Sequence, residues 1–131
     1  MNKDSCVSAL DKYLKGTKGS YLYLHEAKLI DHCKYENAIC FVLAFWSAPA
    51  IASLVHYLNF LSQVELKPNV SILILNTDAI PEFYDHPLLE GKIHGWSESF
   101  IWQNGELKSE NCDGRSLERL SSYLQENSLL N

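Results

Sequence analysis

Cysteine is the most reactive residue type in this chain. The spacing of the cysteines, however, argues against both disulfide exchange and zinc binding. The four cysteines are Cys6, Cys33, Cys40 and Cys112. Thiol–disulfide exchange and zinc binding commonly use two cysteines separated by two residues, and no such pair is present. Cys40 lies in an apolar stretch, where a thiol is expected to pack in the core. We therefore expect reduced cysteines without a catalytic role.

Two further groupings hold reactive side chain types but lack the surroundings that their chemistry needs. His32, Cys33 and His56 are possible zinc ligands at a spacing that is atypical of zinc sites, so no metal site is predicted. Ser53 comes shortly before His56, but a nucleophilic serine needs an oriented base, an oxyanion hole and commonly a Gly-x-Ser-x-Gly turn. Ser53 is instead expected to make a local hydrogen bond near a helix start.

The neighbouring pair Asp85-His86 has the residue types used in general acid–base catalysis. The pair stands directly before Pro87 in a segment expected to be a loop, so a solvated turn is the favoured interpretation. No glycine-rich phosphate loop and no metalloprotease motif occurs in the sequence. We therefore predict no catalytic residue, no cofactor and no enzymatic activity.

Length, composition and charge narrow the class of protein. With 131 residues, 47% of them hydrophobic and 21% charged, the chain is expected to form one domain, 1–131. The net charge of −5 argues against nucleic acid and is compatible with a basic protein partner. No apolar run is long enough to span a membrane, and the N-terminus lacks the apolar region of a signal peptide. A cytoplasmic location is expected, and the oligomeric state is left open.

Hydrophobic spacing predicts the elements that would position these residues. The stretch 38–46 is apolar almost throughout, as a strand covered on both faces should be. A helical stripe of leucines follows, and then a second apolar strand, so the three form a βαβ unit with parallel strands. Predicted helices are 4–15, 25–35, 49–66, a short one from Pro81, and 116–128. Predicted strands are 21–24, 38–46, 70–75, 99–102, and a return strand from Leu107 after a turn at Asn104-Gly105.

Three short matches, in order and at near-correct spacing, carry a resemblance to a known family. They are Phe45-Trp46 before a turn with Pro49, Asn76-Thr77-Asp78 after the second apolar strand, and Asn104-Gly105-Glu106 in the hairpin. Over 21–129 the chain resembles the thioredoxins. The resemblance implies an α/β, thioredoxin-like three-layer fold: a central mixed sheet with helices on both faces, here with an extra N-terminal helix.

The chain differs from the family at the positions where thioredoxins have their redox-active residues. Counted without gaps from Phe45-Trp46, the family's two cysteines fall on Ala50 and Ser53. Matching Trp46 to the Trp of Trp-Cys-Gly-Pro-Cys places them on Ser47 and Ala50 instead. The ungapped register keeps the helix length better and is preferred. Neither register leaves a thiol.

In the ungapped register, the chain also lacks other residues that thioredoxins have around their active site. The family's buried acid falls on Ala44, a nearby lysine falls on Ile74, and the cis-proline falls on Ser97. The resemblance therefore implies a degenerate thioredoxin-like domain that has lost both the Cys-x-x-Cys pair and the cis-proline.

A redox-inactive protein-binding module, with a chaperone, assembly or adaptor role, is the function that this resemblance favours. Thioredoxins recognise extended segments of partner proteins beside the disulfide, and loss of the cysteines leaves that surface usable. Trp102 is expected in the core, whereas Trp46 and Trp96 are read equally well as binding anchors and as half-buried packing residues. The predicted binding residues are Trp46, Pro49, Ala50, Ile51, Trp96 and Ser97.

Two alternatives stay open at this point. A small acidic immunity or inhibitor protein that neutralises a basic toxin or enzyme would have the size and charge seen here. A thiol oxidoreductase with atypical cysteines would have to use Cys40 or Cys33. Cys40 is expected inside a strand, away from the helix N-terminus that activates a thiolate.

Overall fold

A computed structural model of the chain describes residues 20–24, 35–44, 47–77, 80–87, 89–93, 98–111 and 117–130. Five strands in this part of the chain form one mixed sheet in the order β1-β3-β2-β4-β5. β3 pairs in parallel with β1 and β2, whereas β4 pairs antiparallel with β2 and β5. The strands are β1 Ser20–Leu24, β2 Asn37–Leu43, β3 Val70–Asn76, β4 Ser99–Gln103 and β5 Glu106–Asn111.

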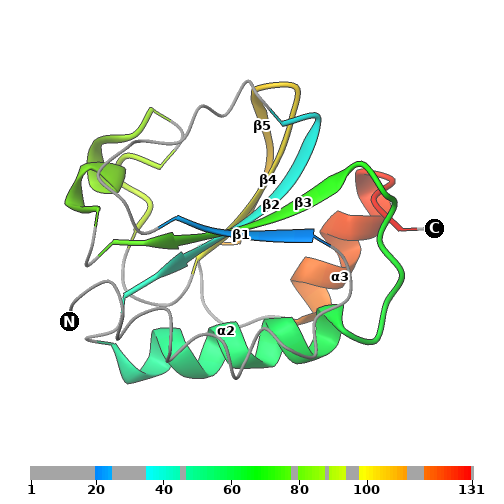
Figure 1. Cartoon of the computed structure of the whole chain (residues 1–131), viewed down its shortest axis with the longest axis horizontal. Coiled ribbons are helices and arrows are strands. Elements are labelled where there is room, and N and C mark those ends of the chain that lie inside the picture. Colours follow the sequence, from blue (N-terminus) through cyan, green and yellow to red (C-terminus); the bar gives the residue numbers. More distant parts are fainter. Residues whose placement is uncertain are drawn as a thin grey trace.

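Helices lie on both faces of this sheet (Figure 1). α2 (Ala48–Leu61) and α3 (Leu117–Glu126) cover one face, and the short 3-10 helix η2 (Pro81–Asp85) lies over the other. α2 connects the parallel strands β2 and β3, so the predicted βαβ unit is confirmed. The predicted helix 4–15 and all but the last residue of 25–35 lie outside the described residues.

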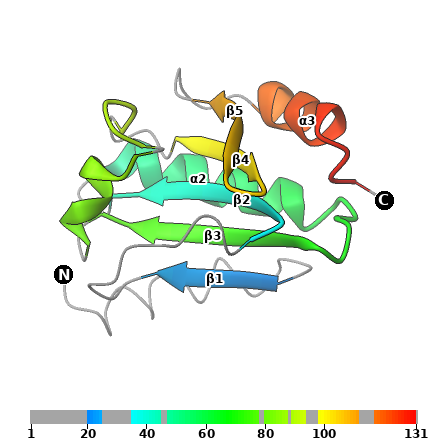
Figure 2. The same cartoon turned by 90° about the horizontal axis from the view of Figure 1, so that it is seen from above.

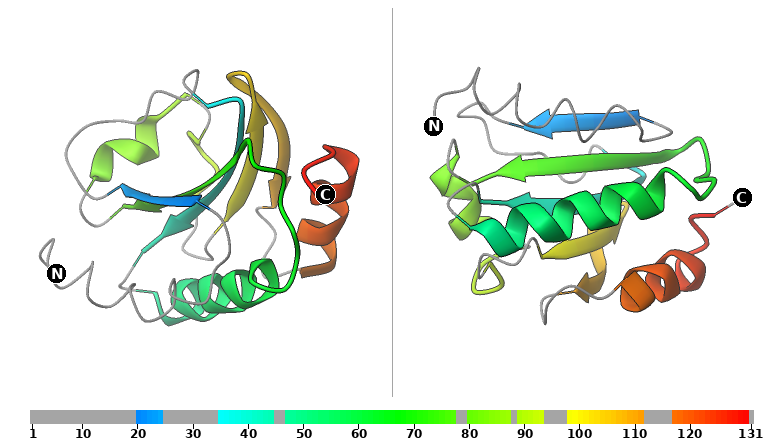
Figure 3. Two further views of the ribbon diagram at one scale, coloured as in Figure 1. Left: turned by 45° about the vertical axis from the view of Figure 1, so that its right-hand side comes forward. Right: turned by 90° about the horizontal axis from the view of Figure 1, so that it is seen from below.

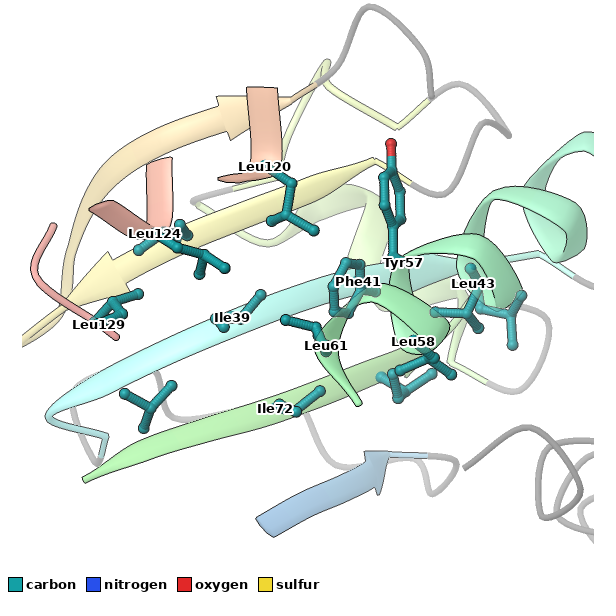
Figure 4. Packing of buried hydrophobic residues seen from close by; sticks show 14 residues of the cluster. Ile39, Phe41, Leu43, Tyr57, Leu58, Leu61, Ile72, Leu120, Leu124 and Leu129 are labelled. Carbon is teal, nitrogen blue, oxygen red and sulfur yellow. The ribbon is translucent and has the colours of Figure 1, made fainter. Parts of the chain in front are cut away.

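The α2 face of the sheet holds the larger core. Leucines of α2 and α3 pack on alternate residues of the strands, and Phe41 stacks on Tyr57 with ring centroids 5.5 Å apart (Figure 4). The intervening residues of β2, among them Cys40, face the opposite core with Phe83 and Trp102. Because both faces of β2 are covered, the strand is apolar throughout rather than alternating.

Three predicted elements end earlier than their apolar patterns suggested. β2 ends at Leu43, and the residues predicted to extend it, Phe45 and Trp46, lie outside the described part. α2 ends at Leu61 rather than at residue 66, because Leu66 pairs as an isolated bridge with Leu130. α3 ends before Ser128, whose φ of 57° is incompatible with a continuing helix.

The predicted turn at Asn104-Gly105 joins β4 to β5. Both residues have positive φ, 51° at Asn104 and 85° at Gly105, as a two-residue hairpin turn of type I′ requires. This turn lies near the start of β2, because Asn37 pairs with Gln103. The strands of the parallel pair therefore end at one pole of the molecule, and the hairpin turn lies at the other (Figure 2).

Candidate functional site

The site to which the sequence pointed is the pole where β2 ends and α2 begins. The N-cap of α2 is Ser47, whose backbone is extended and whose Oγ accepts a hydrogen bond from the Ala50 amide at 3.2 Å. Pro49 stands in the first turn, where its missing amide proton leaves no hydrogen bond unmade. No acidic residue lies in this first turn, so the positive end of the helix dipole is not neutralised by α2's own side chains.

Hydrogen bonds to the end of β2 hold this helix start in place. The Ser47 amide donates to the Ala44 carbonyl at 3.1 Å, which closes the turn between strand and helix. The amide and the hydroxyl of Thr77 both donate to the Leu43 carbonyl at 3.0 Å, and so join the ends of β2 and β3. Carboxyl ends of parallel strands are a common ligand-binding location in α/β folds.

Several polar side chains are buried near this pole, and the sequence analysis did not predict their burial. Asn76 is the last residue of β3 and Thr77 follows it, and Glu98, which is only 1% exposed, stands directly before β4. The Glu98 carbonyl accepts a hydrogen bond from the Val42 amide at 3.0 Å, so its backbone continues the pairing of β2 with β4. A charged residue before an apolar strand gives no sequence signal of burial, which is why Glu98 was missed.

No family model matches the chain, and no curated protein sequence matches it. Solved structures of thioredoxins do match it. Thioredoxin from Malassezia sympodialis has a TM-score of 0.67 at 13% identity, over 86% of this chain and 94% of that chain. Spinach chloroplast thioredoxin F, short form, has a TM-score of 0.63 at 13% identity, with 84% and 95% covered. A mutant thioredoxin from Halobacterium salinarum NRC-1 has a TM-score of 0.62 at 14% identity, with 88% and 96% covered.

The chain has the thioredoxin fold. The expected fold class, a central mixed sheet with helices on both faces, is therefore confirmed. The expected extra N-terminal helix lies outside the described residues.

Within the thioredoxin fold, the helix cap favours the register that was not preferred from sequence. A thiolate is activated at a helix N-terminus. Here that position is Ser47, because α2 begins at Ala48. Ala50 and Ser53 lie inside the helix and are buried at 0% and 1% exposure, so neither stands at the helix end. The gapped match of Trp46-Ser47-Ala48-Pro49-Ala50 to Trp-Cys-Gly-Pro-Cys therefore fits the structure better than the ungapped one.

The changed register also moves the place of the family's buried acid. Shifting the first cysteine position from Ala50 to Ser47 carries the acid position from Ala44 to Phe41. Phe41 is fully buried beneath α2, where it stacks on Tyr57. An aromatic ring thus occupies the position, and no proton acceptor is present in either register. Ile74, the place of the lysine in the ungapped register, is likewise a fully buried core residue.

The predicted binding residues are only partly described. Pro49 and Ile51 are half-buried, and Ile51 packs against the α2-face core. Ala50 is fully buried, so its side chain faces the core and is not part of the surface, contrary to expectation. Ala48, which was not proposed as a binding residue, is exposed beside it. Trp46, Trp96 and Ser97 lie outside the described residues.

Cys40 is the one cysteine among the described residues, and it is a core residue as expected. Burial raises the pKa of the Cys40 thiol well above its ordinary value. The thiol therefore keeps its proton, whereas the attacking group in disulfide exchange is the thiolate. Cys6, Cys33 and Cys112 lie outside the described residues.

In the two remaining candidate pairs, Ser53 with His56 and Asp85 with His86, one side chain is buried and the other is exposed. His56 is exposed while Ser53 is buried, so the two do not share a solvent-accessible site. Asp85 is exposed, but His86 is only 2% exposed, so the expected solvated turn is wrong for the histidine. Within the described ranges, no cluster of His, Cys, Asp or Glu is arranged to hold a metal ion. The helices in those ranges are also too short or too polar to cross a bilayer.

Proposed function

We propose that this protein is a redox-inactive thioredoxin-fold module that binds another protein at the pole where α2 begins. The observation that carries the proposal is Ser47 at the N-cap of α2. A serine hydroxyl does not ionise near neutral pH, and the Ser47 Oγ is already used as the acceptor for the Ala50 amide. The position that would activate a thiolate therefore serves to cap the helix.

The alternative of an oxidoreductase with atypical cysteines receives less support. A catalytic thiol needs solvent access and a lowered pKa, and Cys40 has neither. We further propose a protein partner rather than nucleic acid, because the net charge of −5 opposes phosphate binding. A chaperone, assembly or adaptor role in the cytoplasm is proposed on the same grounds.

The proposed contact surface, the α2 pole, consists of Ala48, Pro49 and Ile51, together with Trp46, Trp96 and Ser97 from the sequence. Ala48 is exposed and Pro49 is half-buried at the helix start. Solvent-facing turns are normally polar, whereas this one presents small apolar side chains. Such a surface suits an extended apolar segment of a partner. A tryptophan anchor truncated to alanine, as in Trp96→Ala, would weaken such a contact about thirtyfold.

Insulin reduction tests the redox part of this proposal. The purified protein with dithiothreitol should reduce insulin no faster than dithiothreitol alone. An active thioredoxin run in parallel shows that the assay responds. Reduction above background that disappears in a Cys40→Ala variant would favour the oxidoreductase alternative.

The variant Ala48→Asp tests the contact surface without weakening the fold. An acid in the first turn of a helix interacts favourably with the helix dipole, so stability should stay equal or rise by up to about 1 kcal/mol. The same carboxylate placed in an apolar contact should measurably weaken partner capture from the native source. Asn69→Asp is the matched control, because Asn69 is exposed near the other end of α2. Equal capture of one partner by both variants would exclude the α2 pole as the contact.

A further inference from the structure

A second concave surface lies at the opposite pole of the molecule, beside the hairpin turn. It is a groove of about 440 Å³, here named the hairpin groove, and none of its residues belongs to the α2 pole. The start of β2 supplies one side of the groove, and the β4–β5 hairpin supplies the other. Its lining residues are Glu36, Asn37, Gln103, Asn104, Glu106 and Lys108.

Hydrogen bonds fix the floor of this groove before any ligand arrives. The Asn104 amide donates to the Glu36 carbonyl at 2.9 Å, which ties the hairpin turn to the start of β2. The Gln103 Nε2 group donates to Asn37 Oδ1 at 2.8 Å and to the Asn127 carbonyl at 3.1 Å. Side chains held in this way lose little further freedom on binding, which favours affinity.

The same bonds leave one atom in each of two side-chain amides without a partner among the described residues. Both protons of Gln103 Nε2 are used, so its Oε1 remains as an unused acceptor. Asn37 accepts through Oδ1, and its Nδ2 remains as an unused donor. Asn37 is only 9% exposed and lines the groove. A nearly buried amide with an unused donor is costly unless a ligand or water satisfies it.

The charges of the groove are unequal. Lys108 is paired with Glu106 at 2.9 Å, and this lysine lowers the pKa of the Glu106 carboxyl. The Glu36 carboxylate is exposed and has no ion pair within the described part of the chain. One uncompensated negative charge therefore lies beside a free carbonyl oxygen and a free amide donor, in a protein of net charge −5.

We propose that the hairpin groove binds an arginine side chain within an extended peptide segment of a partner. A guanidinium presents several N–H donors in a planar fork, which suits the Glu36 carboxylate together with Gln103 Oε1. The peptide carbonyl next to that arginine accepts from Asn37 Nδ2. A lysine ammonium lacks the fork and is bound less well. This site does not depend on the function proposed for the α2 pole.

The test uses acetyl-Gly-Arg-Gly-amide as the probe for the intact protein, followed by amide chemical shifts in a titration. Shifts should gather at residues of the hairpin groove, with millimolar affinity. The lysine peptide should bind more weakly, and the citrulline peptide, which is isosteric but uncharged, should not bind. Equal shifts with the citrulline peptide, or shifts confined to other surfaces, would overturn the proposal.

Two substitutions should change the affinity in opposite directions. Glu36→Gln removes the uncompensated carboxylate and should weaken binding about three- to fivefold. Lys108→Gln releases Glu106 from its ion pair and should strengthen binding by a similar factor. Glu82→Gln is the matched control, because Glu82 is an exposed carboxylate on η2 that has no ion pair with any described residue. Equal effects of Glu36→Gln and Glu82→Gln would show that net charge, rather than the groove, attracts the peptide.

Discussion

At the scale of single residues, two positions decide how the thioredoxin fold is used here. Ser47 caps the N-terminus of α2, where a thiolate would be activated, and Phe41 stacks on Tyr57 of that helix. Both residues stabilise the fold, one as a helix cap and one as a stacked core ring. These local interactions support the proposal that this pole has no redox chemistry.

Restoring two cysteines distinguishes the two registers. Ser47→Cys with Ala50→Cys should give a thiol at the helix end with a lowered pKa, and the pair should form a disulfide on mild oxidation. Ala50→Cys with Ser53→Cys should give thiols with raised pKa values, because both positions are buried and neither is the N-cap of α2. Thiolate absorbance against pH measures the difference. Reductase activity should stay weak in both variants because Phe41 supplies no proton acceptor. If only the variant with Ala50→Cys and Ser53→Cys showed a lowered thiol pKa, the ungapped register would be favoured instead.

Burial of Cys40 predicts the pH dependence of stability. Above about pH 8.5, the ordinary thiol pKa, the unfolded chain releases this proton while the folded chain keeps it. The unfolded state is then favoured, so the free energy of unfolding should fall as pH rises. Urea unfolding between about pH 7 and 10 should show a smaller fall in Cys40→Ala than in the parent chain. Identical slopes would mean that Cys40 ionises equally in both states.

At the scale of elements, α2 depends on its cap more than on its C-terminal end. Ser47→Ala leaves the Ala50 amide without its acceptor and should lower the free energy of unfolding by about 1 kcal/mol. Ser62→Ala is the matched control. Its Oγ donates to the Asn59 carbonyl at 2.7 Å near the exposed end of the helix, so its loss should cost less. Urea unfolding compares the two, and equal costs would contradict a special role for the cap.

Elements with strong patterns were predictable, whereas their ends and the site were not. The apolar run of β2, the leucine stripe of α2 and the Asn104-Gly105 turn each have one local interpretation, and the structure confirms all three. The end of α2 was missed because the bridge from Leu66 to Leu130 is a tertiary contact. The choice of register shows a related gap: helix length was weighed, but the cap residue, which favours the other register, was not.

The hairpin groove was also outside the reach of sequence reasoning. Asn37 and Gln103 are far apart along the chain and meet only because β2 and β4 pair antiparallel. No motif marks them, since each residue is ordinary at the end of a strand. Only the pairing register brings their amides together.

At the scale of the whole molecule, the sheet separates the two proposed contact surfaces. α2 and α3 lie together on one face, and the start of α2 and the β4–β5 hairpin turn lie toward opposite ends of β2 (Figure 3). A strand of this length spans roughly 20 Å. If both proposals hold, the protein would contact two places on one partner, or two partners at once.

Because the α2 pole and the hairpin groove are far apart, we expect substitutions at one to have no influence on partner binding at the other. Ala48→Asp and Glu36→Gln lie at opposite poles without shared neighbours, so their effects on partner affinity should add within about 0.5 kcal/mol. A double-mutant cycle on the captured partner measures this. A coupling well above that value would indicate that the partner changes the conformation of the sheet between the poles.

β5 has a consequence for self-association. Its exposed residues Glu106, Lys108 and Glu110 alternate in charge along the strand, and the ladder to β4 is irregular between Ile101 and Trp102. Charged side chains and an irregular ladder are the means by which proteins keep an edge strand from acting as a template for another chain. Concentrated protein should therefore resist edge-to-edge aggregation at β5. We expect a partner at this edge to contact the side chains of β5 rather than to pair with β5 as an additional strand of the sheet.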